Sequence, residues 1–192
     1  MILFPVILPV VENMDRLSGR ENVALLSKVS RQALKLSAEK SGVVLGELSK
    51  DEKDVPLPFG SYYWSISHKP RYVAAVIGDS CIGIDIEEVR PRPESIFGYV
   101  ASDEDWDLMG GKSLHAFFRC WTAKEAVLKA AGIGIGGLMK CRVLSVPDEV
   151  HIILNYQDCD YEVEQLYYNN HIVTVLKNDN KVEWVYPGRG KL

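Results

Sequence analysis

The sequence predicts an α+β fold made of two similar tandem halves, a pseudo-dimer in which each half is a long helix packed on an antiparallel sheet. Two observations predict it. Apolar residues recur at helical spacing in two separate stretches, and strand-like runs divided by turn residues follow each stretch. Helix followed by strands therefore occurs twice along the chain, as expected of an α+β protein. The halves share no obvious sequence identity, and we place them at residues 1–83 and 84–192.

The first half begins with an apolar segment that contains two prolines, which an edge strand tolerates. Ser18 and Glu21 have the spacing of a capping box, and the helical pattern that follows meets a plausible stop at Gly42. A proline-containing loop covers residues 50–60. Strands are then expected at 62–67, 71–77 and 81–87.

The second half has the same order. Ser113 is expected to cap a helix that runs to about Ala131 and ends at Gly132. Asparagine-rich turns at 169–170 and 178–180 divide the later strands. These strands are expected at 141–146, 151–156, 161–167, 171–176 and 182–186.

Composition limits the classes of function. The 22 Lys and Arg against 26 Asp and Glu give a net charge of −4, which offers no general attraction to nucleic acid or an anionic membrane. The apolar start is too short to span a bilayer and lacks the features of a secretion signal. The four cysteines show no zinc-ligand spacing, so we expect reduced thiols in a cytoplasmic protein rather than disulfides.

Asp85 and Glu87 form the first candidate site. They alternate with isoleucines along one predicted strand, so both carboxylates point to the same face. Neighbouring like charges favour a cation between them, and Mg²⁺ prefers a few carboxylate oxygens together with phosphate and water. The alternative is a solvated polar face on a half-buried strand.

Two further segments carry polar groups that suit phosphate chemistry. Glu125 and Lys129 share one face of the second helix, where they provide either a metal ligand and a phosphate contact or a surface salt bridge. Ser67 and His68 end a strand before a turn, where they suit either a phosphate or an ordinary hairpin.

The three segments together resemble the 4′-phosphopantetheinyl transferase superfamily. The resemblance covers residues 53–135, and the chain length indicates the longer, surfactin-synthetase-activating (Sfp-like) type. The family motifs are a GxDxE-type strand and a W/F-x-x-K-E-A-x-x-K helix. They are matched by Gly83, Asp85 and Glu87 and by Trp121, Lys124, Glu125, Ala126 and Lys129.

The resemblance implies an Mg²⁺-dependent enzyme, active as a monomer, with its site in the cleft between the halves. Such an enzyme moves the phosphopantetheine arm of coenzyme A to a serine of an apo acyl or peptidyl carrier protein and releases 3′,5′-ADP. The implied metal ligands are Asp85, Glu87 and Glu125. Glu125 is also the implied general base and Lys129 the phosphate contact. The other implied coenzyme A contacts are Ser67, His68, Lys53 and Lys124.

The chain departs from the family pattern in two places. Asp105 stands where the family often has the glutamate of a Phe-Ser-x-x-Glu element. Basic residues that bind the 3′-phosphate often lie in the N-terminal region, where Arg16 and Arg20 are the candidates. The alternatives are a different Mg²⁺-dependent phosphoryl-transfer or phosphodiester-cleaving enzyme, and a binding module without catalysis. The sequence does not identify the carrier protein.

Overall fold

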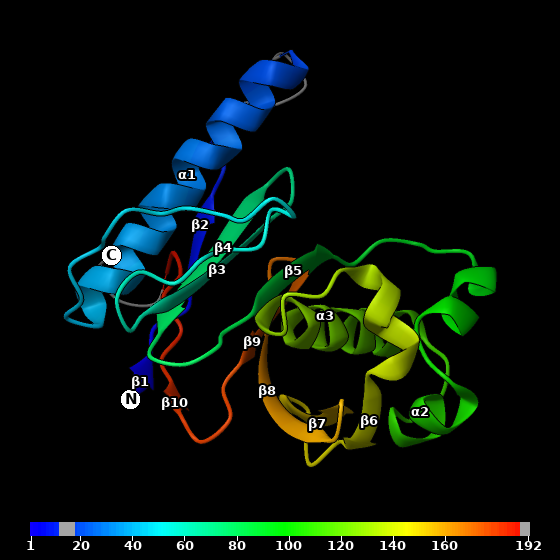
Figure 1. Cartoon of the computed structure of the whole chain (residues 1–192). Helices are drawn as coiled ribbons and strands as arrows, with labels where there is room; N and C mark the ends of the chain where they lie inside the picture. Colours follow the sequence, from blue (N-terminus) through cyan, green and yellow to red (C-terminus); the bar gives the residue numbers. More distant parts are fainter. Residues whose placement is uncertain (12–17, 189–192) are drawn as a thin grey trace.

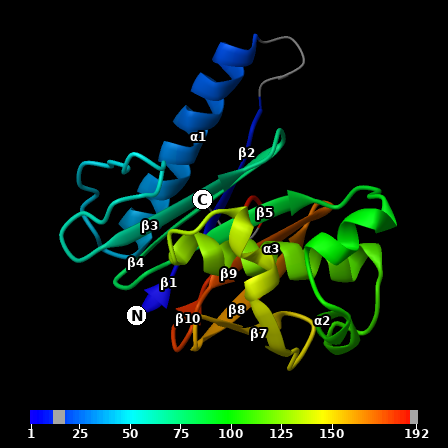
Figure 2. The same ribbon diagram turned by 45° about the vertical axis from the view of Figure 1, so that its right-hand side comes forward.

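The computed structural model describes residues 1–11 and 18–188, and it shows two lobes side by side in both views (Figure 1 and Figure 2). Each lobe has a long helix against an antiparallel sheet. The α+β class and the helix-on-sheet layers are therefore as the sequence predicts. Within the described part of the chain, no helix combines the length and apolarity that crossing a bilayer requires.

The N-terminal lobe consists of α1 (Gly19–Lys40) on a sheet of three strands. The strands are β2 (Val6–Pro9), β4 (Tyr72–Gly78) and β3 (Tyr63–His68), in the antiparallel order β2-β4-β3. The predicted capping box is present, because Ser18 Oγ accepts from the Glu21 N–H and Glu21 Oε2 accepts from the Ser18 N–H. The face of α1 against the sheet is buried at Val29, Ser30, Ala33, Leu34, Ser37 and Ala38.

The C-terminal lobe packs α3 (Leu114–Ala130) on a sheet of five antiparallel strands in the order β5-β9-β8-β7-β6. The strands are β5 (Ile84–Glu88), β6 (Arg142–Ser145), β7 (His151–Tyr156), β8 (Cys159–Tyr168) and β9 (His171–Leu176). Three short helices were not predicted: α2 (Asp103–Leu108), η2 (Glu94–Tyr99) and η3 (Ile135–Lys140). They are too short to show a helical repeat of apolar residues.

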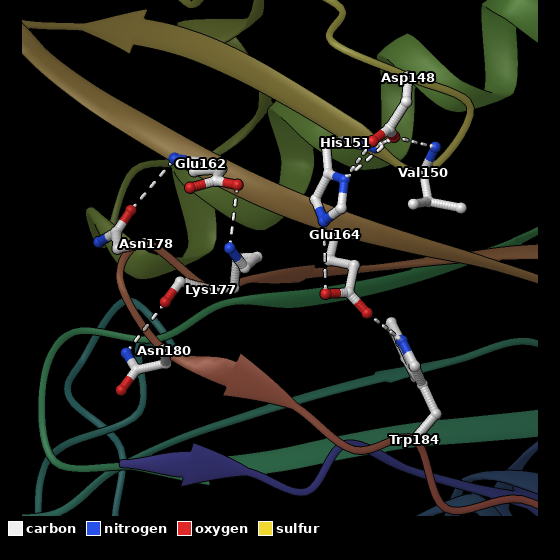
Figure 3. Close-up of polar contacts among 9 residues, drawn as sticks. All are labelled: Asp148, Val150, His151, Glu162, Glu164, Lys177, Asn178, Asn180 and Trp184. Atoms are coloured by element: carbon white, nitrogen blue, oxygen red, sulfur yellow. Dashed lines mark hydrogen bonds and ion pairs between the residues drawn. The ribbon is translucent and has the colours of Figure 1, made fainter.

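The end of the chain returns to its beginning, which the predicted boundary at residue 83 did not anticipate. β10 (Lys181–Val182) pairs in parallel with β1 (Ile2–Leu3), and Val185 bridges to Val6. Only part of the predicted strand at 182–186 is regular. Figure 3 shows how polar contacts hold this segment to β8, since Glu164 accepts a hydrogen bond from the indole N–H of Trp184 at 2.8 Å.

A shared apolar cluster joins the two sheets. It consists of residues from β1, β2, β4, β5 and β9, the Ile82 loop and the returning segment. Ile84 and Ile86 of β5 are fully buried in it. The other face of β5 therefore turns toward α3 and β3, and this places the acidic side chains of β5 between the lobes.

Candidate active site

Two acidic side chains of β5, those of Asp85 and Glu87, are buried rather than solvated. Asp85 is 4% exposed and Glu87 is 8% exposed. Burying an ionised carboxylate is costly unless cations or hydrogen-bond donors surround it. The sequence predicted the shared face from strand alternation. Only the structure shows that other elements cover that face.

β3 supplies a row of polar groups along β5. Ser65, Ser67 and Lys69, the residue after β3, are two positions apart, so they project to one side of the strand. Trp64 and Ile66 project to the other side, into the core of the N-terminal lobe. Ser65 Oγ accepts from the Ile84 N–H at 3.1 Å, and Ser67 Oγ donates to Asp85 Oδ1 at 2.8 Å. Lys69 Nζ lies 2.7 Å from a Glu87 carboxylate oxygen. Ser67, which was predicted to contact coenzyme A, thus also orients Asp85.

α3 brings the remaining charged groups to β5. Lys129 Nζ donates to Asp85 Oδ1 at 2.7 Å and to the Ile84 carbonyl at 3.0 Å. The helix lies very close to the strand at Gly83, where an added Cβ would be 1.8 Å from the Ala126 carbonyl oxygen. The glycine of the strand motif is therefore required by the approach of the helix that carries Glu125 and Lys129.

The electrostatics of Glu125 support a cation site. Burial, followed by the charge of Asp85, raises the pKa of Glu125 to about 7. Among the described residues, Glu125 Oε1 and Asp85 Oδ2 are buried without a hydrogen-bond partner. Two buried carboxylate oxygens without partners fit a divalent cation, which would satisfy both.

The carboxylates do not form a complete metal cage by themselves. No group of three or more His, Cys, Asp or Glu side chains in residues 1–11 and 18–188 is gathered closely enough to hold a metal ion. Mg²⁺ is usually bound by one or two carboxylates and completes its shell with substrate phosphate and water, and Asp85 and Glu125 offer it two carboxylate oxygens without partners among the described residues. The residues present therefore fit Mg²⁺ together with a phosphate-bearing substrate.

A cavity of about 740 Å³ runs between α1, the loop before β3, and the end of α3. Lys129 lines this cavity and also contacts Asp85, so it connects the cavity to the carboxylates. The volume of the cavity is in the range of small-molecule sites. The cavity brings together Lys53, His68 and Lys129, which the sequence predicted to contact coenzyme A. Apolar side chains, among them Leu26 and Trp64, form other walls, so the cavity combines apolar and cationic surfaces.

Two basic residues of this cavity, Arg31 and Lys50, were missed by sequence reasoning. Arg31 follows Ser27 by one helical turn, and both line the cavity. This spacing was visible in the sequence, but nothing there indicated which side of α1 faces the cavity. Arg20 is exposed at the start of α1 and is not among the residues described as lining the cavity, and Arg16 lies outside the described residues.

Lys124 does not join the other predicted site residues. It is 0% exposed on another face of α3, where its Nζ donates to Asp105 Oδ2 at 2.8 Å and to the Val100 carbonyl at 2.9 Å. Asp105 also accepts from the Val143 N–H. The structure thus places the Lys124 ammonium out of contact with the cavity and gives Lys124 and Asp105 a structural role, in contrast to the expected coenzyme A contact.

Comparison with known proteins agrees with this site. The family model of the 4′-phosphopantetheinyl transferase superfamily matches residues 81–176, which is half of the chain and includes β5 and α3. The chain belongs to this superfamily. The matched family region contains five of the predicted site residues, Asp85, Glu87, Lys124, Glu125 and Lys129. It also contains Gly83, where α3 approaches the strand.

Several curated relatives are similar to this chain. A Haemophilus influenzae protein with a provisional 4′-phosphopantetheinyl transferase name is 34% identical over 134 residues, which cover 65% of this chain and 56% of the relative. The 4′-phosphopantetheinyl transferase psf-1 of Bacillus pumilus is 31% identical over 96 residues, 48% of this chain and 41% of psf-1. The enzyme AcpT of Escherichia coli is 27% identical over 127 residues, 62% of this chain and 61% of AcpT. The matches thus span about half the length of these superfamily members.

Proposed function

We propose that the chain is a 4′-phosphopantetheinyl transferase, which moves the phosphopantetheine arm of coenzyme A to a serine of an apo acyl or peptidyl carrier protein and releases 3′,5′-ADP. One observation carries the proposal: the buried carboxylates of β5 and α3, two of whose oxygens have no partner among the described residues, are connected through Lys129 to a cavity lined by cationic side chains. A carboxylate site for Mg²⁺ beside a phosphate-binding cavity is what pyrophosphate cleavage requires.

The proposed metal ligands are Asp85, Glu87 and Glu125, and Mg²⁺ would offset charge on the pyrophosphate. Ser67 orients Asp85 through its 2.8 Å hydrogen bond. Glu125 is also assigned to accept the proton of the carrier serine, directly or through water. Lys129 stabilises charge on the departing 3′,5′-ADP.

The cavity is the proposed site for the nucleotide end of coenzyme A. His68, which we assign to the 3′-phosphate, has a pKa lowered by burial and then by the nearby Lys129. It would therefore contact the phosphate as a hydrogen-bond donor at neutral pH. Lys53, Lys50 and Arg31 would supply positive charge around the same phosphate.

Several broader features of the protein belong to the same proposal. We assign the chain to the longer, Sfp-like type, with tandem halves that enclose one active site, and expect it to act as a monomer in the cytoplasm without nucleic acid or a membrane. The repeated helix-on-sheet lobes support the tandem arrangement. The four cysteines, which are unpaired in the structure, are compatible with a reducing compartment.

The decisive experiment is incubation with coenzyme A, Mg²⁺ and a panel of apo carrier proteins, followed by mass spectrometry of each carrier. Addition of one phosphopantetheine group, lost when the carrier serine is changed to alanine, is the expected result. Release of 3′,5′-ADP without carrier modification would favour a phosphodiester-cleaving enzyme. Binding of coenzyme A with neither product would favour a binding module without catalysis.

A further inference from the structure

Two acidic residues of β5, Asp85 and Glu87, are each already paired with a lysine. Lys129 Nζ lies 2.7 Å from Asp85 Oδ1, and Lys69 Nζ lies 2.7 Å from Glu87 Oε1. The proposed chemistry uses Lys129 but gives no task to Lys69. Lys69 therefore forms an ion pair with Glu87, a carboxylate that is proposed to bind the metal.

The position of Lys69 is set by the backbone rather than by a flexible side chain alone. Its N–H donates to the Tyr72 carbonyl at 2.8 Å, and its carbonyl accepts from the Tyr72 N–H at 3.3 Å, which closes the hairpin between β3 and β4. Because Lys69 is two residues beyond Ser67, both side chains project toward β5. The hairpin therefore places the Lys69 ammonium against Glu87, as β3 places the Ser67 hydroxyl against Asp85.

The two partners differ in their access to water. The Lys69 side chain is 32% exposed, whereas the Glu87 side chain is 10% exposed. The ammonium can return to water at a modest cost, but the carboxylate cannot. A divalent cation on Glu87 would also repel an ammonium held 2.7 Å from the same carboxylate. The cation and Lys69 are therefore competitors for Glu87.

We propose that Lys69 is a built-in counter-ion that competes with the divalent cation for Glu87 and makes metal binding conditional on the phosphate groups of coenzyme A. This inference rests on the proposed function, because it takes the carboxylates as the metal site. A cation that binds alone meets the positive charge of the ammonium at the same carboxylate, which weakens its binding. When coenzyme A binds as well, the ammonium gains an anionic partner in its phosphate groups, because His68, the residue before Lys69, lines the cavity. Metal and coenzyme A then strengthen each other's binding.

The test is titration of the full chain with Mn²⁺, in which free Mn²⁺ is followed by electron paramagnetic resonance with and without coenzyme A. Lys69→Met removes the charge and keeps much of the side-chain length, and Lys69→Gln is a second uncharged variant. Lys69→Arg keeps the charge. Lys112→Met is the matched control, because Lys112 forms a 2.7 Å ion pair with Asp103 on an exposed part of the chain.

Without coenzyme A, Lys69→Met and Lys69→Gln should bind Mn²⁺ about tenfold more tightly than wild type, while Lys69→Arg and Lys112→Met should stay within about threefold. The strengthening of Mn²⁺ binding by coenzyme A should be about tenfold smaller in the two uncharged variants. Equal or weaker Mn²⁺ binding in these variants, an arginine variant that behaves like them, or no Mn²⁺ binding by any of the proteins would overturn the inference. Carrier modification, measured separately by mass, reports on the proposed function alone, since Mn²⁺ binding requires no turnover.

Discussion

Two lysines on different faces of α3 each pair with an aspartate from another element, and the surroundings of the two pairs differ. Lys124 and Asp105 are 2.8 Å apart with side chains 0% and 1% exposed. Both make further hydrogen bonds, to the Val100 carbonyl and from the Val143 N–H. This pair is sealed, and its charged groups are satisfied by the protein itself.

The second pair, Lys129 and Asp85, has nearly the same separation of 2.7 Å but is open. The Lys129 side chain is 29% exposed, and Asp85 Oδ2 makes no hydrogen bond within the described part of the chain. A buried polar atom without a partner is destabilising, and such atoms concentrate where a ligand completes the site. The comparison indicates that a satisfied pair holds the fold, whereas an incomplete pair is available for chemistry.

Asp85→Asn should produce the largest functional loss. The amide keeps the shape of Asp85 but removes the charge that the proposed metal site needs, so turnover should fall by about 10³-fold or more, since a bound metal ion contributes several kcal/mol. Carrier modification measured by mass spectrometry tests this. The matched variant Asp105→Asn should instead lower stability with much less effect on turnover per folded molecule. Near wild-type turnover in folded Asp85→Asn would remove Asp85 from the site.

Lys124→Met should produce the largest loss of stability. It leaves Asp105 buried without its cation, and breaking a buried ion pair costs about 3–5 kcal/mol. The matched variant Lys129→Met should lose less, because the Lys129 side chain is 29% exposed and Asp85 keeps its hydrogen bond from Ser67. Urea unfolding of both variants measures the difference. Equal losses in the two variants would contradict the distinction between sealed and open pairs.

Glu125→Gln separates the role of Glu125 from that of Lys129 within the open site. Loss of a general base should reduce turnover by about 10²-fold, while coenzyme A still binds. Lys129→Ala should lower both coenzyme A affinity and turnover, because Lys129 is proposed to contact phosphate before and during departure of the leaving group. Calorimetric titration beside single-turnover kinetics distinguishes the two patterns. If both variants are fully active, the pair is only a structural feature.

The smallest expected effect is a pH dependence of stability in the metal-free protein. The pKa of Glu125 is raised from 4.5 to about 7, first by burial and then by Asp85. The folded state therefore holds the Glu125 proton more tightly than the unfolded state, and this difference stabilises the folded protein. The stabilisation is full below pH 4.5 and is lost as the pH rises through about 7. Between pH 5 and 8, the free energy of unfolding of wild type should fall by about 1–2 kcal/mol relative to that of Glu125→Gln, after allowance for the partial exposure of Glu125.

Urea unfolding in chelator at several pH values measures this difference between wild type and Glu125→Gln. Glu39→Gln, a change of an exposed glutamate in α1, is the control and should follow wild type at every pH. Parallel curves for wild type and Glu125→Gln would show that Glu125 does not hold its proton more tightly in the folded protein.

Local patterns in the sequence were sufficient for much of the fold. The strands predicted at 151–156 and 171–176 have the observed bounds of β7 and β9, and the capping residues Ser18 and Ser113 begin the two long helices. Alternation along β5 also placed Asp85 and Glu87 on one face. These features follow from spacing within a single element, so the sequence alone carries them.

What the sequence determined was thus which residues share a face of one strand or helix, including Glu125 with Lys129. The tertiary structure decided what each face meets. It buried the acidic face of β5 under α3 and β3, placed Lys124 against Asp105, and brought Lys69 to Glu87 and Arg31 to the cavity. These contacts join residues from different elements. They depend on how the helices and sheets stack, which the periodicity of a single element does not specify.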